Sequence, residues 1–167
     1  MRVLVTYGST RGGTEGLAHL VADDLRDEGV TVNLLPPSQV KNLDDYDAVV
    51  VGGALYSSRW HRQARQFVRQ HTGELRQRPT FFFSSGPLDD SASRSTIPPV
   101  RQVKALMGRV SARDHMTFGG RLARDAAGFA ASAMAKKNSG DWRDAAQVQA
   151  WAKSIAAQLH HEAEPSS

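Results

Sequence analysis

Short apolar runs alternate with amphipathic stretches along almost the whole chain. Residues 3–7 and 47–53 are short runs rich in β-branched side chains, which predicts strands that are buried on both faces. In residues 14–28 the leucines and valines recur at helical spacing, and Gly29 ends the segment. The same reasoning predicts further strands at residues 30–35, 79–84 and 115–118, and further helices at residues 60–71, 98–109 and 145–160.

This alternation, with its short connections, predicts an α/β fold: a doubly wound, mostly parallel sheet with helices on both faces. The chain has no internal repeat and no linker. We therefore expect a single domain over residues 1–161, with residues 162–167 as a frayed tail. Ligands bind such sheets beyond the carboxyl ends of the strands, at a topological switch point. The loops after the first, third and fourth predicted strands are thus candidate binding loops.

Charge and cysteine content narrow the choice of chemistry. The chain carries 21 Lys and Arg against 17 Asp and Glu, a net charge of +4, and no cysteine. A disulfide scaffold, thiolate-bound metals and thiol catalysis are therefore excluded, and no other metal site is predicted. No apolar run reaches the ~20 residues of a membrane span, and the first residues do not form a signal peptide, so we expect a cytoplasmic protein. The positive charge leaves open a peripheral contact with the inner face of the membrane.

The first candidate loop follows the first strand and leads directly into a helix. Backbone N–H groups and the positive end of the helix dipole favour a phosphate there, and hydroxyl groups can donate further hydrogen bonds. The alternative is an ordinary capped helix start. The loop lacks the Walker pattern and the dinucleotide-binding glycine pattern, and its hydroxyls suit a terminal phosphate monoester. The candidate phosphate-binding residues are Ser9, Thr10, Arg11, Gly12, Gly13 and Thr14.

The second and third candidate loops follow the predicted strands at residues 47–53 and 79–84. Their small residues would allow a flat ring to lie against the backbone, and Trp60 is either a ring contact or part of the core. Exposed arginines at residues 59, 62, 65 and 69 are either a solvated helix face or a binding site for an acidic substrate. Nucleic acid is not favoured, because these arginines lack interleaved exposed aromatics. The candidate ring-binding residues are Ala54, Leu55, Tyr56, Ser85, Gly86 and Pro87, and the candidate substrate or partner residues are Arg59, Trp60 and Arg62.

The first loop resembles the phosphate loop of the flavodoxin family. Ser9, Gly12 and Thr14 match its Ser/Thr-x-Thr-Gly-x-Thr pattern, whereas Arg11 and Gly13 depart from it. The resemblance implies a flavodoxin-like five-stranded parallel sheet of order 2-1-3-4-5. It also implies that FMN is the cofactor, with its phosphate in this loop.

Further motifs resemble one branch of that family, related to menaquinone-dependent protoporphyrinogen oxidase. The motifs are Gly-Ala-Leu-Tyr at 53–56, Arg-Trp-His at 59–61, Phe-Phe-Ser-Ser-Gly-Pro at 82–87, Phe-Gly-Gly-Arg-Leu at 118–122 and Gly-Asp-Trp-Arg-Asp at 140–144. The branch implies an oxidoreductase that passes electrons through flavin from a small-molecule donor to a quinone or other acceptor. In the most specific form of this expectation the donor is porphyrinogen-like. The alternative is a non-enzymatic flavodoxin-type electron-transfer protein. Because carriers of that family tend to be acidic, the basic charge here favours the enzyme or implies an acidic partner.

An Ala-rich segment at about residues 121–139 precedes the last predicted helix. It is interpreted as an insertion that covers the flavin pocket, contacts a quinone, lies on a membrane surface or packs as an ordinary helix. The sequence indicates neither an acid–base pair for catalysis nor an oligomeric state.

Overall fold

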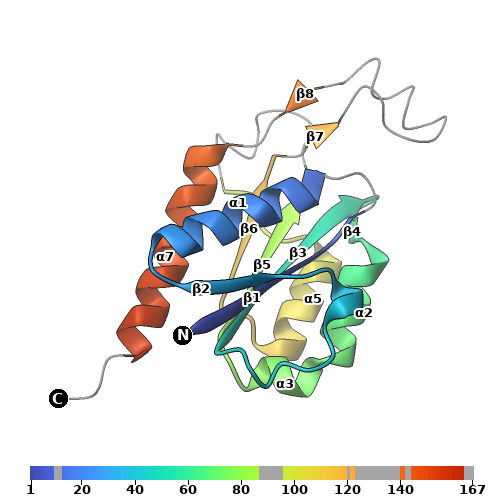
Figure 1. The fold of residues 1–167 in the computed structure, drawn as a ribbon. Coiled ribbons are helices and arrows are strands. Elements are labelled where there is room, and N and C mark those ends of the chain that lie inside the picture. Colours follow the sequence, from blue (N-terminus) through green and yellow to red (C-terminus); the bar gives the residue numbers. More distant parts are fainter. Residues whose placement is uncertain (10–12, 87–95, 120, 123–139, 142–143, 164–167) are drawn as a thin grey trace.

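A parallel sheet forms the centre of the molecule in the computed structural model, which describes residues 1–9, 13–86, 96–119, 121–122, 140–141 and 144–163 (Figure 1). Its strand order is β2-β1-β3-β5-β6. Because β4 is only a short strand antiparallel to β3, this order is the one expected for the five predicted strands. The strands are β1 (Arg2–Gly8), β2 (Thr31–Leu34), β3 (Ala48–Tyr56), β4 (Arg59–Trp60), β5 (Thr80–Ser85) and β6 (Asp114–Phe118); β7 (Arg121–Leu122) pairs separately with β8 (Gly140–Asp141).

Helices cover both faces of this sheet, as the alternating pattern predicts (Figure 1). Apolar residues of α1 and α7 pack with one set of strand residues, and those of α2 and α5 pack with the other set. A short 3₁₀ helix, η1 (Pro37–Gln39), lies in the polar stretch before β3. The helices are α1 (Gly13–Asp27), α2 (Arg62–Gln70), α3 (Thr72–Arg76), α5 (Arg101–Val110) and α7 (Ala145–Ala163).

The core divides into two layers because successive strand side chains point to opposite faces of the sheet. Val50 and Phe83 join the layer under α1 and α7, whereas Val51 and Phe82 join the layer under α2 and α5. All four are fully buried. The uninterrupted valine and phenylalanine runs in the sequence are thus explained by burial on both faces.

Several predicted boundaries are wrong: the strand predicted at residues 47–53 continues to Tyr56, and the helix predicted at residues 98–109 begins at Arg101. The helix predicted over residues 60–71 begins at Arg62, because Trp60 belongs to β4 and the His61 side chain caps the helix by accepting from Gln63 N. The prediction includes Trp60 because its spacing from Ala64 is that of one helical turn. The last helix continues to Ala163, into the predicted tail. Most of the Ala-rich segment, residues 123–139, lies outside the described residues.

Candidate cofactor-binding site

The carboxyl ends of β1, β3 and β5 lie at one edge of the sheet, on the side where α1 begins (Figure 1). In the ladder, Gly53 pairs with Gly8 on one side and with Ser84 on the other. The chain leaves β1 toward β2 and later returns to the opposite side of β1 with β3, so the switch point lies between β1 and β3. The three predicted loops therefore start from the same edge. Thr10, Arg11, Gly12 and Pro87 lie outside the described residues.

Thr14 has the clearest signature of a ligand contact at this edge. It lies in the first turn of α1, directly after Gly13, and is 1% exposed. Its Oγ1 is buried and has no hydrogen-bond partner among the described residues. A buried hydroxyl without a partner is unfavourable by about 1–3 kcal/mol, so such groups normally have a ligand or water. Its position beside the unpaired N–H groups of a helix start suits an anion.

The hairpin between β3 and β4 forms a second wall of the site. Leu55 pairs with Trp60 and Tyr56 pairs with Arg59, which leaves Ser57 and Ser58 as a two-residue turn. Both serines have positive φ, 49° and 63°. Two-residue hairpin turns of type I′ need positive φ at both positions, and Asn-Gly is the preferred pair. The serines therefore hold a strained turn at the rim of the site.

Replacing Ser57-Ser58 with Asn-Gly is expected to stabilise the fold by about 1 kcal/mol, because these residues adopt left-handed backbone angles more readily. Urea unfolding monitored by circular dichroism measures the change. Ser111→Gly is expected to stabilise the fold for the same reason, since Ser111 has φ 55° at the end of α5. Ser154→Gly, at an exposed site inside α7, is expected to destabilise by roughly 0.5 kcal/mol. A destabilised Asn-Gly variant would contradict the strained-turn interpretation.

Trp60 anchors this hairpin from inside the core. It is 1% exposed, and its ring packs against Phe82 with the centroids 4.7 Å apart. Its indole Nε1–H donates to Ser84 Oγ at 2.9 Å, and its backbone N–H donates to Gln102 Oε1 at 2.9 Å. The structure thus favours the core alternative for Trp60, because its ring has no exposed face that could contact a substrate or partner.

The hydrogen-bond chain continues from Ser84 to His115. Ser84 Oγ lies 2.8 Å from His115 Nε2, and both residues are buried. Burial lowers the pKa of His115 to about 4, and the nearby Asp114 carboxylate opposes this only in part. The imidazole is therefore neutral near pH 7, where its Nε2 can accept the Ser84 hydroxyl proton.

The two glycines that end the valine run face the protein's own rings. A Cβ at Gly52 would lie 2.5 Å from Cε1 and Cε2 of Phe83, and one at Gly53 would lie 2.6 Å from Cγ of Trp60. The expectation that small residues in this loop leave space for a flat ligand ring is therefore wrong at these two positions. Further along, Gly86 approaches Leu55, because a Cβ on Gly86 would lie 2.9 Å from Leu55 Cδ1.

Predicted residues of the second and third loops are thus neighbours in space. Leu55 and Tyr56 are half-buried, Ala54 is 7% exposed and Ser85 is 8% exposed. Gly86 N–H donates to Phe118 O at 3.1 Å, which ties the third loop to the end of β6. Of these, the half-buried Leu55 and Tyr56 present the most side-chain surface to a ligand.

His61 lies at the candidate site, although it is not among the predicted site residues and the sequence names it only in the Arg-Trp-His motif at 59–61. Its Nδ1 accepts from Gln63 N at 3.1 Å, so the neutral imidazole carries its proton on Nε2. Its ring lies 6.0 Å from that of Tyr56, and a Cβ on Gly8 would come within 3.2 Å of Nδ1. Burial, then the Arg65 charge, lowers the pKa of His61. The motif assigns no role to this histidine, whereas the fold places it beside Gly8 at the end of β1, at the switch point.

Arg59 and Arg62 are exposed at the rim of this edge, on β4 and at the start of α2. Neither makes an ion pair with a carboxylate of the described residues. Arg65 instead donates from Nε to Trp60 O at 3.1 Å and is half-buried. Two cations therefore remain available to an anionic ligand at the rim.

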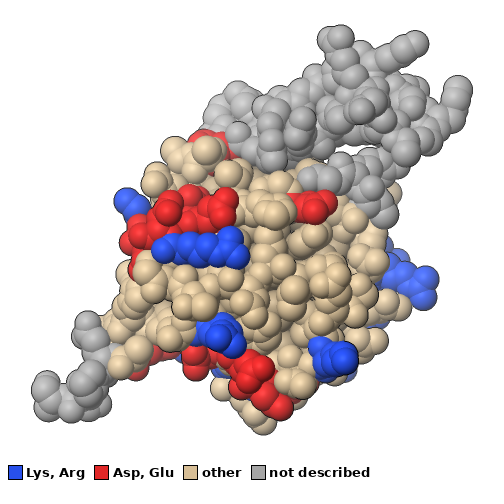
Figure 2. Space-filling view, viewed as in Figure 1, with Lys and Arg blue, Asp and Glu red and all other residues tan. Residues whose placement is uncertain are grey.

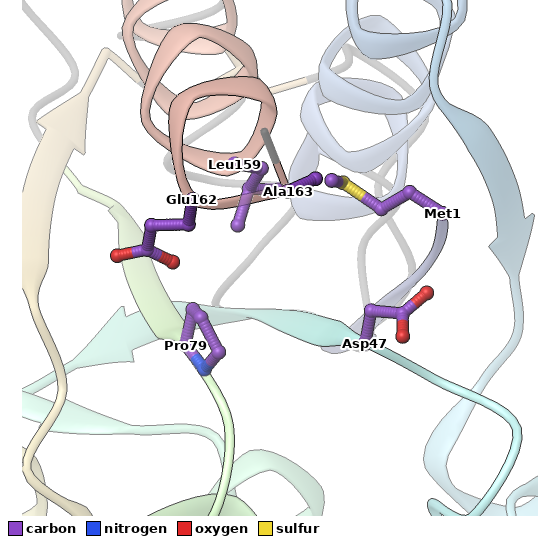
Figure 3. A pocket seen from close by; sticks show the side chains of 6 residues that line it. All are labelled: Met1, Asp47, Pro79, Leu159, Glu162 and Ala163. Atoms are coloured by element: carbon purple, nitrogen blue, oxygen red, sulfur yellow. The ribbon is translucent and has the colours of Figure 1, made fainter. Parts of the chain in front are cut away.

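A hollow of about 340 Å³ lies at the opposite, amino end of the strands, between Met1, Asp47, Pro79 and the end of α7 (Figure 3). Its two carboxylates are already engaged, since Asp47 accepts from Arg2 N and Glu162 pairs with Arg113. Ligands of doubly wound sheets bind at the other end. The hollow is therefore not part of the candidate site.

Residues 4–140 match the family model of the flavodoxin domain. The chain belongs to the flavodoxin-domain family. Membership implies that it binds FMN, and the buried Thr14 hydroxyl at the start of α1, which has no partner among the described residues, fits the phosphate end of that cofactor. None of the helices within the described ranges is long and apolar enough to cross a membrane.

Known proteins resemble this flavodoxin domain at low identity. Protoporphyrinogen IX dehydrogenase (quinone) of Escherichia coli K12 is 24% identical over 86 residues, which are 50% of this chain and 48% of that protein. The chain thus aligns with about half the length of the curated relatives it matches. Rubredoxin oxygen:oxidoreductase of Desulfovibrio gigas superposes with a TM-score of 0.67 at 18% identity, covering 98% of this chain and 37% of that one. An archaeal flavodoxin superposes with a TM-score of 0.66 at 16% identity, and the match covers 96% of this chain and 100% of that one. The two structures establish the fold.

Proposed function

We propose that this flavodoxin domain is an FMN-dependent oxidoreductase that takes electrons from a reduced, carboxylate-bearing substrate of the porphyrinogen type and passes them to a quinone. The observation that carries the proposal is the pair of exposed arginines, Arg59 and Arg62, at the rim of the cofactor edge, neither of which pairs with a carboxylate of the described residues. Guanidinium groups bind carboxylates through paired hydrogen bonds. The partial match to a quinone-dependent protoporphyrinogen IX dehydrogenase supports the same substrate class.

The roles of the chain's own residues in this proposal are binding and orientation. The Thr14 hydroxyl and the first N–H groups of α1 hold the phosphate, and Leu55 and Tyr56 form one wall for the ring. Arg59 and Arg62 hold the carboxylates of the substrate. FMN, when bound, supplies the exchange of electrons between donor and acceptor, so the protein itself needs no nucleophile.

Removing the two rim arginines tests the substrate class. The Arg59→Gln/Arg62→Gln variant is expected to raise KM for protoporphyrinogen IX by roughly tenfold or more, since each charged hydrogen bond contributes about 1.5–3 kcal/mol. Porphyrin fluorescence measures the rate, with menadione as the quinone under anaerobic conditions. The kcat and the KM for menadione should stay within about twofold of the wild type.

Arg2→Gln, an exposed arginine at the amino end of β1, is the matched control and should leave all three constants unchanged. If Arg2→Gln raised the KM for protoporphyrinogen IX as much as Arg59→Gln/Arg62→Gln does, this would contradict the assignment of Arg59 and Arg62. If FMN-loaded protein turns over neither porphyrinogen nor quinone, the enzyme proposal itself is wrong.

Replacing Thr14 tests the phosphate contact separately. Thr14→Val keeps the shape of the buried side chain but removes the hydroxyl, so FMN affinity is expected to fall roughly tenfold. Thr14→Ser keeps the hydroxyl and should bind within about threefold of the wild type. Quenching of FMN fluorescence on titration gives both dissociation constants. Equal affinity of the Val and Ser variants would refute the contact.

A non-enzymatic electron-transfer protein is the second candidate. The observation in its favour is that the chain superposes on the whole length of an archaeal flavodoxin. Rapid electron exchange with a redox protein, without turnover of porphyrinogen or quinone, would favour this alternative.

A further inference from the structure

Basic side chains are concentrated on one surface of the molecule, formed by β4, α2, α3 and α5. We call this surface the basic face. These four elements contain a single carboxylate, Glu74. Packing brings α2, α3 and α5 together on the same side of the sheet. The residues of the basic face are Arg59, Arg62, Arg65, Arg69, Arg76, Arg101, Lys104 and Arg109.

Carboxylates of the described residues do not neutralise the charge of the basic face. Within the described part of the chain, no ion pair joins any of its cations to a carboxylate. Glu74 is already committed, because its Oε1 lies 3.0 Å from His71 Nδ1 and its Oε2 accepts from Leu43 N at 2.7 Å. Arg76 donates to Arg109 O, and Arg109 donates to Thr72 Oγ1, so these side chains are held in place without losing charge.

Negative charge is concentrated on α1. Red carboxylate side chains cluster over this helix in Figure 2. Burial raises the pKa of Asp24 on this helix, and the neighbouring Asp27 and Asp23 carboxylates raise it further. The net charge of +4 therefore conceals two separated surfaces of opposite sign. Such separation orients a charged partner as it approaches.

We propose that the basic face is a docking site for an acidic protein, one whose surface carries a cluster of Asp and Glu side chains. Seven of its eight cations are arginines, whose planar guanidinium groups bind carboxylates in pairs. Arg59 and Arg62 form the end of the basic face that borders the cofactor edge, so a docked protein lies beside the site. This proposal rests on charge distribution and does not depend on the identity of the substrate.

Size and polarity favour a transient protein partner over a membrane. Helices of 9 and 10 residues are about 15 Å long and about 10 Å in diameter, so α2 and α5 side by side present roughly 300 Å². That area suits the small end of protein interfaces, where redox and other short-lived encounters lie. Insertion into a membrane surface needs exposed apolar side chains, and among the described residues Met1 is the one large apolar side chain that is exposed.

The test compares two double variants that change the net charge equally. Arg69→Glu/Lys104→Glu alters the basic face away from the cofactor edge, and Arg2→Glu/Lys153→Glu alters exposed residues of β1 and α7. The probe is fluorescent poly-L-glutamate of about 20 residues, and anisotropy is measured on the FMN-loaded protein at low and physiological ionic strength. We expect the first variant to bind at least tenfold more weakly and the second within about threefold of the wild type.

Equal losses in the two double variants would overturn the proposal, because net charge alone would then explain binding. The neutral Arg69→Gln/Lys104→Gln variant should show an intermediate loss and guards against misfolding of the Glu variant, with circular dichroism as the check. Vesicles with 30 mol% phosphatidylglycerol and a DNA duplex are tested in parallel at about 150 mM salt. Tighter binding of either one than of polyglutamate, lost in the first variant, would also overturn it.

Discussion

Gly52→Ala is expected to destabilise the fold by about 1–3 kcal/mol, at the upper end of that range, because the added methyl group overlaps the Phe83 ring. The new Cβ would lie 2.5 Å from both Cε atoms of Phe83. This ring has no room to move: it is fully buried and packs 6.1 Å, between ring centroids, from both Phe118 and Trp151. Urea unfolding followed by circular dichroism at pH 7 gives the change in the free energy of unfolding.

Gly108→Ala is the matched control for this prediction. Gly108 lies inside α5, and a Cβ there meets no atom within 4 Å. Alanine is a better helix former than glycine, so this change is expected to stabilise by about 0.5–1 kcal/mol. A Gly52→Ala variant as stable as the wild type would show that the Phe83 ring yields, and the close packing across the central strands would then not explain the glycine.

Gly52 and Gly53, at the end of the valine run, show what the sequence pattern could not predict. The pattern of buried strands and amphipathic helices predicts the sheet order and the edge at which the binding loops meet, because periodicity and short connections leave few arrangements. What a glycine at the end of a strand faces depends on neighbouring strands, whose register the sequence does not state. Phe83 and Trp60 occupy the space that the sequence pattern assigns to a ligand ring.

Trp60 and His61 show the same limit at the residue level. Apolar spacing places Trp60 at the start of a helix, but the two-residue turn at Ser57-Ser58 folds it back along β3. As a result His61, instead of Trp60, caps α2 and lies at the switch point. Local spacing cannot distinguish these outcomes, because the turn depends on positive φ values that serine rarely adopts. Thr14, by contrast, could be predicted, since a helix start after a strand fixes its surroundings.

Acidification is expected to remove about 3 kcal/mol of stability through His115 alone. The ordinary pKa of histidine is 6.5, and burial lowers the pKa of His115 to about 4 in the folded state. Above pH 6.5 the group is neutral in both states. Between these values the unfolded chain binds a proton that the folded chain does not, so the free energy of unfolding falls as the pH falls from 6.5 to about 4. The added proton goes to Nε2, which accepts the Ser84 hydroxyl proton in the neutral form, while the buried Nδ1, which has no partner among the described residues, already carries the proton of the neutral imidazole.

The measurement is a set of urea titrations at steps from pH 7 to pH 4, on the wild type and on His115→Gln. Glutamine can still accept the Ser84 hydroxyl proton but does not titrate, so the variant is expected to lose about 3 kcal/mol less than the wild type over this range. His61 contributes to the acid loss in the same direction, because its pKa is also lowered, and it does so equally in both proteins. His161→Gln, at an exposed position in the last turn of α7, should keep the full acid loss.

Cofactor affinity separates a local effect of His115 from a general loss of stability. A protonated imidazole cannot accept the Ser84 hydroxyl proton at Nε2, and Ser84 is the partner that holds the Trp60 indole and, with it, the hairpin of Leu55 and Tyr56. FMN affinity of the wild type is therefore expected to weaken toward pH 4 while the protein is still folded, and His115→Gln should weaken less. Parallel acid profiles of stability in the wild type and His115→Gln would contradict the assignment, since the proton would then bind elsewhere.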